Sequence, residues 1–192
     1  MRIVGGTLRG RAFEAPEGRD TRPTTDRMRE SIASMVLSAC DLDLSNCSVL
    51  DAFAGSGAMG LELCSRGAER CTFVERNGRA ARVVRRNCQT LLTQGTWDVL
   101  TGDMVRLATK PRLPGSPFDL VFLDPPYAMS ARDVSAIVAN LAVGGHLARG
   151  CLFVYERAAK APGLLVEGAY ALRSRSHGGT CIDLMRMDSQ NG

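Results

Sequence analysis

The sequence predicts an α/β protein built on a parallel, doubly wound sheet. From residue 48 onward, short apolar strands alternate with helical segments, which is the pattern of consecutive strand–helix units. Residues 118–123 are apolar except for Asp119, as expected of a strand that helices cover on both faces. A glycine loop with the spacing G-x-G-x-x-G follows the first of these strands. The 192 residues suffice for one such domain with a small appendage.

The first 20 residues are expected to form that appendage, a small β-hairpin. Residues 3–4 (Ile-Val) and 12–13 (Ala-Phe) can form two short strands, and the glycine-rich stretch between them favours a turn. Residues 15–23 contain two prolines and a glycine and are typical of a linker. The sequence therefore predicts a hairpin unit over residues 1–20 and the main domain over residues 21–192.

Periodicity and turn residues predict the remaining elements. A helix is expected to begin at Thr24 or Thr25, whose hydroxyl can cap it, with Asp26 in the first turn where the helix dipole favours an acid. Its apolar residues recur at helical spacing up to Ala39. Further helices are expected from the glycine loop to residue 66, at residues 79–92 and at residues 131–142. Strands are expected at residues 48–53, 71–74, 97–100, 118–123, 151–155, 164–173 and 180–187.

The composition argues against several classes of protein. The seven cysteines form no C-x-x-C pair and the two histidines stand apart, so we expect reduced cysteines in the core and no metal site. No apolar run approaches the length of a membrane span, and the N-terminus lacks the hydrophobic segment of a secretory signal. We therefore expect a cytoplasmic protein that needs no metal and no membrane.

The glycine loop predicts a pocket for a nucleoside cofactor. Its three glycines, beginning at Gly55, lie between a strand and a helix, where the backbone can approach a ligand closely. Acids occur at three consecutive strand ends, Asp51, Glu75 and Asp103, where carboxylates can accept ribose hydroxyls and an adenine amine. The residues expected to bind the cofactor are Asp51, Phe53, Ala54, Gly55, Gly57, Glu75, Asp103 and Met104.

The motif Asp124-Pro125-Pro126-Tyr127 directly follows the apolar strand at residues 118–123. A proline-rich turn alone would explain the prolines but not the acid and the aromatic residue beside them. An exocyclic base amine is a poor nucleophile, and Asp124 together with the Pro125 carbonyl can accept its N–H groups and hold the nitrogen in line with an electrophilic methyl group. Tyr127 can stack on an extruded base. We therefore predict direct methyl transfer, with Asp124, Pro125 and Tyr127 as catalytic residues.

These motifs resemble those of class I methyltransferases that act on exocyclic amines, and more narrowly the RsmD-type enzymes, which methylate guanine N2 in bacterial small-subunit ribosomal RNA. The resemblance implies a Rossmann-like class I fold and S-adenosylmethionine as cofactor. It implies a guanine of 16S ribosomal RNA, free or within the assembled small subunit, as the target, and we expect a monomer. The matching segments are Arg2-Ile3-Val4-Gly5-Gly6, Arg9-Gly10-Arg11, Arg22-Pro23-Thr24-Thr25-Asp26-Arg27, Asp51–Gly60 and Asp124–Tyr127.

The N-terminal part is expected to contact RNA. Residues 1–12 contain three arginines and no acid, and arginine binds phosphate bidentately. We expect residues 1–20 to dock RNA, so that a chain without them would stay folded and still bind the cofactor; the competing interpretation is that the hairpin covers an edge of the sheet. The residues expected to contact the RNA are Arg2, Arg9, Arg11, Arg22 and Thr24.

Three alternative functions use the same motifs. A DNA adenine-N6 methyltransferase also contains Asp-Pro-Pro-Tyr, and Tyr127 stands where the RsmD-type family often has phenylalanine, but such an enzyme usually needs a base-reading region for which this chain has no insertion. An NAD-dependent oxidoreductase would leave the Asp124 motif unexplained. A non-catalytic RNA-binding module is disfavoured because both the loop and the motif are intact.

Overall fold

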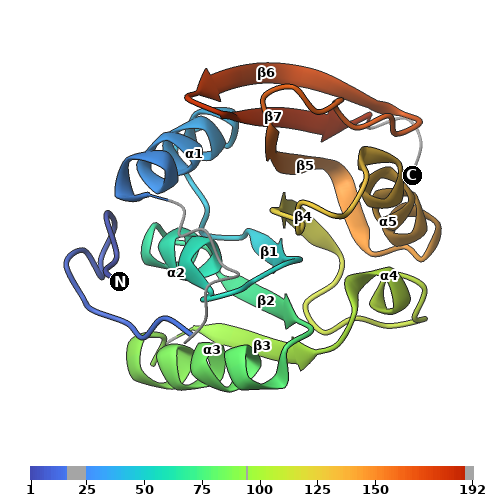
Figure 1. Cartoon of the computed structure of the whole chain (residues 1–192). Helices are drawn as coiled ribbons and strands as arrows, with labels where there is room; N and C mark the ends of the chain where they lie inside the picture. The colour runs from blue at the N-terminus through green and yellow to red at the C-terminus, as the bar shows by residue number, and fades with distance from the viewer. Residues whose placement is uncertain (17–24, 94, 189–192) are drawn as a thin grey trace.

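A single seven-stranded sheet forms the middle layer of the molecule in a computed structural model that describes residues 1–16, 25–93 and 95–188. Helices cover both faces of the sheet, with α1, α2 and α3 on one face and α4 and α5 on the other (Figure 1). The strands are β1 (Ser48–Asp51), β2 (Arg70–Glu75), β3 (Thr96–Thr101), β4 (Phe118–Leu123), β5 (Leu147–Ala158), β6 (Ala169–His177) and β7 (Thr180–Met187). The helices are α1 (Asp26–Ala39), α2 (Ala58–Ser65), α3 (Gly78–Leu91), α4 (Met104–Leu107) and α5 (Ala131–Val143).

The strand order is β3-β2-β1-β4-β5-β7-β6. The first five strands are parallel to one another, whereas β7 runs antiparallel between β5 and β6. The order reverses at β1, whose neighbours are β2 and β4, and ligands of open α/β sheets bind beside such a reversal at the carboxyl ends of the strands. The expected doubly wound sheet is confirmed, with an antiparallel pair added at one end.

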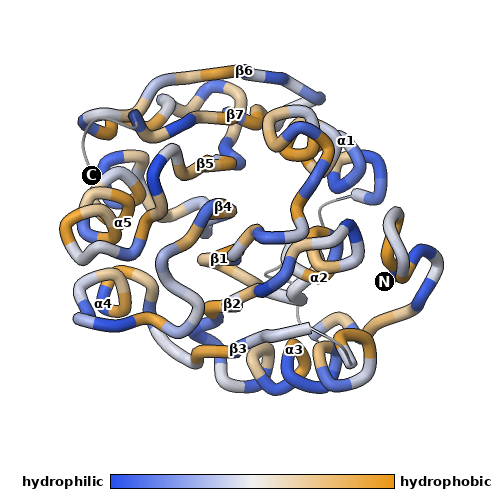
Figure 2. The backbone as a smooth tube through the Cα atoms, turned by 180° about the vertical axis from the view of Figure 1, so that it is seen from behind, coloured by the Kyte–Doolittle hydropathy of each residue, from blue (hydrophilic) through white to orange (hydrophobic). Residues whose placement is uncertain are grey.

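Two hydrophobic clusters fill the layers on either side of the sheet. Alternate strand residues point to opposite faces, so that in β4 Leu120 and Phe122 pack on the α1–α3 side, and Val121 and Leu123 pack on the α4–α5 side. Hydrophobic and hydrophilic stretches alternate along α3, as expected of a helix with one face on the sheet (Figure 2). Within the described ranges, no helix is long and apolar enough to span a bilayer.

Most expected elements are confirmed within a few residues, and Thr25 caps α1 by accepting a hydrogen bond from the Met28 amide at 3.2 Å. The strand expected at residues 164–173 is present but its bounds are wrong, because β6 covers Ala169–His177. The apolar residues 164–166 suggested a strand, yet Leu164 packs into the core from an irregular segment that contains Pro162 and Gly163. The short helix α4 was not expected; it begins after Asp103, whose carboxylate accepts a hydrogen bond from the Val105 amide at 2.9 Å.

The N-terminal hairpin is present but short, with one antiparallel bridge between Arg2 and Ala12. We call residues 1–14 the N-terminal ribbon. It packs on α2 and not on an edge of the sheet, since the Thr7 amide donates to the Ser65 carbonyl at 2.7 Å. Ile3 and Phe13 join the hydrophobic cluster on the α1–α3 side. The competing interpretation of the ribbon as cover for a sheet edge is therefore wrong, while the expected boundary at residue 20 lies outside the described residues.

Candidate active site

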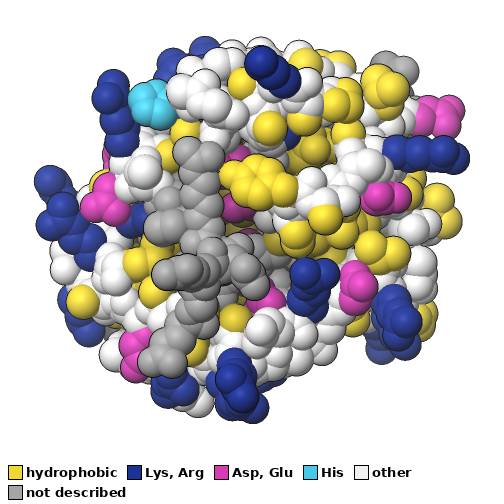
Figure 3. Space-filling view, in the orientation of Figure 1, with side chains coloured by type: hydrophobic (Ala, Val, Ile, Leu, Met, Phe, Trp, Pro, Cys, Tyr) yellow, Lys and Arg dark blue, Asp and Glu magenta, His cyan; other side chains and the backbone are white. Residues whose placement is uncertain are grey.

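A cavity of about 1040 Å³ opens at the carboxyl edge of the parallel strands. Its wall includes the segments that follow β1, β2, β3 and β4, together with the beginning of α1 and the turn between β6 and β7. In the space-filling view, acidic atoms are seen in the middle of this face, and Lys and Arg side chains lie around its periphery (Figure 3). Seven of the eight residues expected to bind a cofactor line this cavity, and only Gly57 does not.

The glycine loop between β1 and α2 depends on its glycines for two different reasons. Gly57 has a φ of 77°, which is in the left-handed region that side chains rarely adopt. Gly60 lies one turn into α2, and a Cβ atom there would come within 2.3 Å of Cε1 of Phe73 on β2. The third glycine of the motif therefore allows close packing of the helix on the strand, which brings the helix N-terminus to the edge of the cavity.

Asp51 ends β1 and is almost completely buried, with 1% of its surface exposed. Its Oδ2 atom accepts a hydrogen bond from the Gly60 amide at 3.0 Å. Burial is the main reason that the pKa of Asp51 rises to about 7, and the nearby Glu75 charge adds to the rise. The Oδ1 atom has no hydrogen-bond partner among the described residues. Asp51 thus presents an acceptor that a ligand in the cavity can satisfy.

The titration of Asp51 predicts that the ligand-free protein loses stability as pH rises from about 4 to about 7. In the folded protein the pKa is about 7 and in the unfolded chain it is near 3.8, so between these values the native state holds a proton that the unfolded state has released. This contribution to the free energy of unfolding is complete below pH 4 and lost above pH 7. Asp51→Asn lacks the titration but can keep the hydrogen bond from Gly60.

Urea unfolding of both proteins at about pH 5 and pH 8 measures the effect of the Asp51 carboxyl, including its influence on the pKa of Asp124, because the two chains differ at this residue alone. The wild type should lose about 2–3 kcal/mol more than Asp51→Asn between the two values. Parallel pH dependences in the two proteins would show that Asp51 does not hold a proton in the folded state.

Glu75 and Asp103 follow the next two strands along the same edge. The Glu75 carboxylate accepts hydrogen bonds from the Gly55 amide at 2.9 Å and the Asn77 amide at 2.7 Å, so it also anchors the glycine loop to β2. A carboxylate has about four acceptor positions, and two of those of Glu75 are left for a ligand. Asp103 caps α4 and is exposed at the cavity wall.

The four residues of the Asp-Pro-Pro-Tyr motif line the cavity directly after β4. The pKa of Asp124 lies well above its usual value, first because of burial and then because of the charges of Glu156 and Asp51. Tyr127 is 76% exposed, which leaves its ring accessible at the mouth of the cavity. The Pro126 carbonyl accepts a hydrogen bond from the Met129 amide at 2.8 Å and closes the turn after the motif.

Glu156 on β5 lies beside Asp124 and was not expected from the sequence. Leu123 of β4 pairs with Tyr155 of β5 in parallel register, so Asp124 and Glu156 are the next residues on adjacent strands and lie on the same face of the sheet. Both line the large cavity and a smaller one of about 70 Å³ next to it. The sequence does contain a signal, because Glu156 follows an apolar run just as Asp124 does.

Three of the five residues expected to contact RNA are described by the structure, and these three do not line the cavity. Arg9 and Arg11 are exposed on the N-terminal ribbon, and neither lines the cavity. Arg2 is 71% exposed at its side chain, and its Nε atom forms an ion pair with Asp26 at 3.2 Å. Arg22 and Thr24 fall outside the described residues. Among the described residues there is no cluster of His, Cys, Asp and Glu that could hold a metal ion.

Comparison with known proteins shows extensive similarity to one family. The model of the family described as Conserved hypothetical protein 95 matches residues 1–186. The Bacillus subtilis protein YlbH is 39% identical over 127 residues, which are 66% of this chain and 67% of that protein. Ribosomal RNA small subunit methyltransferase D of Escherichia coli is 37% identical over 127 residues, and the match covers 60% of its length.

Solved structures extend the similarity to the whole fold. The Escherichia coli protein yhhF superposes with a TM-score of 0.84 at 28% identity, and the match covers 99% of both chains. A magnesium protoporphyrin IX methyltransferase from Synechocystis with bound S-adenosylmethionine shares the fold at a TM-score of 0.64 and 19% identity. The expected class I methyltransferase fold is therefore confirmed.

Proposed function

This chain belongs to the Conserved hypothetical protein 95 family, and on that premise we propose that it transfers a methyl group from S-adenosylmethionine to the exocyclic N2 amine of a guanine in 16S ribosomal RNA. One observation carries the proposal. Asp124 and its Pro-Pro-Tyr continuation lie in the wall of the same cavity as the glycine loop and Glu75, so an amine acceptor and a nucleoside cofactor site face one another.

The charge of the cavity fits S-adenosylmethionine better than a dinucleotide. Five carboxylates of the described residues line the cavity together with a single arginine, Arg76. A sulfonium and an ammonium group gain from this negative field, whereas a pyrophosphate would be repelled by it. The buried Oδ1 atom of Asp51 supplies an acceptor for such a cation. We propose that the carboxylates of Asp51, Glu75 and Asp103 hold the cofactor, with Phe53, Ala54, Gly55 and Met104 forming the wall around it.

The Asp-Pro-Pro-Tyr motif positions the base amine. When bound, S-adenosylmethionine supplies the electrophilic methyl group. Asp124 accepts one N–H of the amine, the Pro125 carbonyl accepts the other, and the nitrogen is thereby held in line for attack. Tyr127 stacks on the extruded base at the mouth of the cavity. The proton released by the amine passes to the Asp124 carboxylate, whose raised pKa suits it to receive a proton.

Two adjacent carboxylates favour guanine over adenine as the target. The Watson–Crick edge of guanine presents the N1–H and the N2 amine as neighbouring donors, whereas adenine presents an amine beside an N1 acceptor. Asp124 and Glu156 lie side by side on one face of the sheet and can accept from both guanine donors. When both carboxyl groups are ionised, an adenine N1 atom would face a carboxylate with no proton between them, which costs binding energy.

Mass spectrometry of ribosomal RNA nucleosides tests the activity. Small-subunit RNA that lacks the modification should gain N2-methylguanine when it is incubated with this protein and S-adenosylmethionine. Formation of N6-methyladenine would support the adenine methyltransferase instead, and the absence of any methylated base would contradict the proposed function. The same assay on naked RNA and on small subunits identifies which of the two is the substrate.

We further propose that the enzyme acts as a monomer in the cytoplasm. Light scattering of the purified protein measures its mass in solution and so tests the monomeric state.

The proposed RNA contacts are Arg2, Arg9, Arg11, Arg22 and Thr24. Of these, Arg9 and Arg11 are the strongest candidates because their exposed side chains form no hydrogen bond or ion pair with other described residues. Fluorescence anisotropy with a labelled segment of 16S RNA measures the loss of RNA affinity when both arginines are replaced by alanine.

Replacing Glu75 by alanine is expected to weaken the affinity for S-adenosylmethionine by at least tenfold. Hydrogen bonds to a charged group are worth about 1.5–3 kcal/mol each, and the variant also loses the carboxylate that anchors Gly55. Calorimetric titration measures the dissociation constant. Glu69→Ala is the matched control, since Glu69 is exposed and immediately precedes the opposite end of β2. Equal affinities of Glu75→Ala and Glu69→Ala would exclude Glu75 from the cofactor site.

A further inference from the structure

Strand β6 forms one edge of the sheet and is exposed along its length except for its first residue, Ala169, which is partly buried. It lies at the top of the molecule in Figure 1, beyond the helices that cover the other strands, and basic side chains are seen along the same edge of the face in Figure 3. Residues 169–179 contain Arg173, Arg175 and His177 and no acid. Burial of apolar side chains in the core does not account for an exposed edge strand with this positive charge.

The register places these side chains on the same face of the sheet as the candidate active site. Residues directly opposite one another in antiparallel strands share a face. Arg175 of β6 and Glu156 of β5 are both opposite Ile182 of β7, and Glu156 lies beside Asp124. Asp124, Glu156, Ile182 and Arg175 therefore form one row across four strands. Three strand spacings separate Arg175 from Asp124, which is about 14 Å.

The same face continues from β6 into the cavity. His177 and Thr180 pair across the turn between β6 and β7, and both line the cavity with the two glycines between them. In the other direction, Arg173 is opposite Leu184, and Tyr170 is opposite Arg186, two residues further along β7. Tyr170 is 50% exposed. A continuous surface thus leads from the mouth of the cavity over two arginines to an exposed aromatic ring.

The chemistry of this surface suits a polyanion with stacked bases. Within the described part of the chain, no hydrogen bond or ion pair engages the side chain of Arg173 or Arg175. Guanidinium groups bind phosphate bidentately, and an aromatic ring accepts a base on its face. Arg175 lies three strand spacings, about 14 Å, from Asp124, and therefore close to the base that is proposed to occupy the cavity.

We propose that the face of β6 that carries Arg173, Arg175 and Tyr170 is the docking surface for the RNA backbone next to the target guanine. The two arginines bind phosphates and Tyr170 stacks on a base. This inference rests on the proposed function, because it takes RNA as the substrate of the cavity. In addition to the RNA contacts proposed for the N-terminal ribbon, the β6 surface would contact RNA at the end of the sheet opposite to β3. The surface accounts for why β6 has no cover from either helix layer.

The test compares two double variants of the full chain. Arg173→Ala/Arg175→Ala removes the two cations of β6, and Arg79→Ala/Arg82→Ala removes two exposed arginines from α3 at the other end of the sheet. Fluorescence anisotropy with a labelled single-stranded segment of 16S RNA gives the dissociation constant at several salt concentrations. The β6 variant should bind about tenfold more weakly or worse, and its slope of log affinity against log salt should fall by about 1.4, as expected for two lost phosphate contacts.

The outcomes separate this inference from the proposed function. Retained affinity for S-adenosylmethionine in calorimetry shows that the β6 variant is folded. If that variant then binds RNA like the wild type, or no more weakly than the α3 variant, the docking surface is refuted while methylation by the wild type still supports the enzyme. If the wild type itself forms no N2-methylguanine, the proposed function fails whatever the variants do.

Discussion

Replacing Asp124 by alanine is expected to reduce methyl transfer by about 10²–10³-fold while leaving the affinity for S-adenosylmethionine near that of the wild type. The loss has this size because the carboxylate acts on the amine during attack, and one preorganised polar group of this kind is worth about that factor in rate. Single-turnover rates with saturating RNA measure the chemical step, and calorimetry measures cofactor binding. A variant that methylates at nearly the wild-type rate would contradict the proposed role of the motif.

The pH profile provides a second readout of the same residue. Burial and the charges of Glu156 and Asp51 raise the pKa of Asp124, and only its anion accepts the amine N–H, so the wild-type rate should rise with pH as this proton is lost. Glu156→Gln removes one of the neighbouring charges and should move the acidic limb of the profile to lower pH. Asp98→Ala on edge strand β3 serves as the control and should leave the profile unchanged. An acidic limb that stays in place in Glu156→Gln would show that Glu156 does not act on Asp124.

The sequence predicted the parts of the fold that local patterns encode. Both ends of β4 were predicted correctly. Its six residues are buried except for the partly exposed Asp119, and a strand buried on both faces has a nearly continuous apolar sequence. The cap of α1 at Thr25 and the glycine loop follow from residues whose conformational preferences are strong. These same local signals mark the strand ends, which is why seven of the eight expected cofactor residues do line one cavity.

The missed features depend on contacts between distant segments. The bounds of β6 were misplaced because this strand is exposed on both faces, so its residues have no alternating pattern that would mark its ends. The position of Glu156 beside Asp124 depends on the register of β4 and β5, which cannot be read from the sequence. The burial of Glu62 in the middle of α2 has no local signal either, because it is explained by the N-terminal ribbon some 57 residues earlier.

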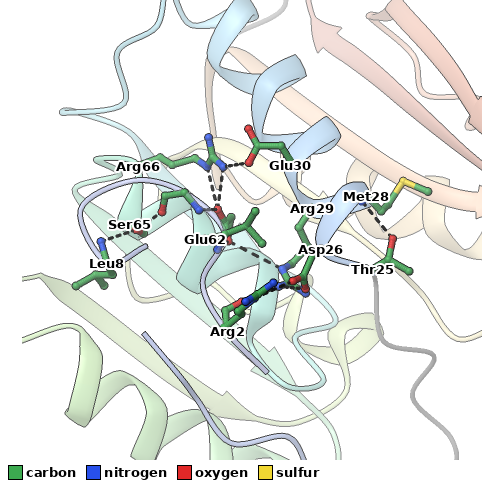
Figure 4. Close-up of polar contacts among 12 residues, drawn as sticks. Arg2, Leu8, Thr25, Asp26, Met28, Arg29, Glu30, Glu62, Ser65 and Arg66 are labelled. Carbon is green, nitrogen blue, oxygen red and sulfur yellow. Dashed lines mark hydrogen bonds and ion pairs between the residues drawn. The ribbon is translucent and has the colours of Figure 1, made fainter. Parts of the chain in front are cut away.

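Glu62 connects three segments through a buried polar network, shown in Figure 4. Its carboxylate is completely buried and accepts hydrogen bonds from the Val4 amide at 2.9 Å and the Gly5 amide at 2.7 Å. It also forms ion pairs with Arg66 of α2 at 2.9 Å and with Arg29 of α1 at 3.9 Å. Arg29 is itself buried and donates to the Arg2 carbonyl at 2.7 Å. The ribbon is therefore bound through charge as well as through Ile3 and Phe13.

Because of this network, removal of residues 1–20 should lower the stability of the rest of the chain. The sequence suggested that a chain without them would stay folded, but the deletion would uncover the cluster into which Ile3 and Phe13 pack. It would also leave the Glu62 carboxylate without two of its donors. We therefore expect the shortened chain to be destabilised, so the docking role of the ribbon must be tested with exposed residues such as Arg9 and Arg11.

Replacing Glu62 by alanine is expected to lower the free energy of unfolding by about 3–5 kcal/mol. The variant leaves two partly buried amides without their acceptor and removes the buried carboxylate that lies between Arg29 and Arg66. For a chain of this length the melting temperature should fall by roughly 6–20 °C. Calorimetric melting and urea unfolding measure both quantities. Glu62→Gln keeps the shape and one carbonyl acceptor and should lose less. Glu69→Ala, an exposed change in the connection between α2 and β2, should lose almost nothing. A melting temperature of Glu62→Ala within a degree or two of that of Glu69→Ala would show that this network does not hold the ribbon on the domain.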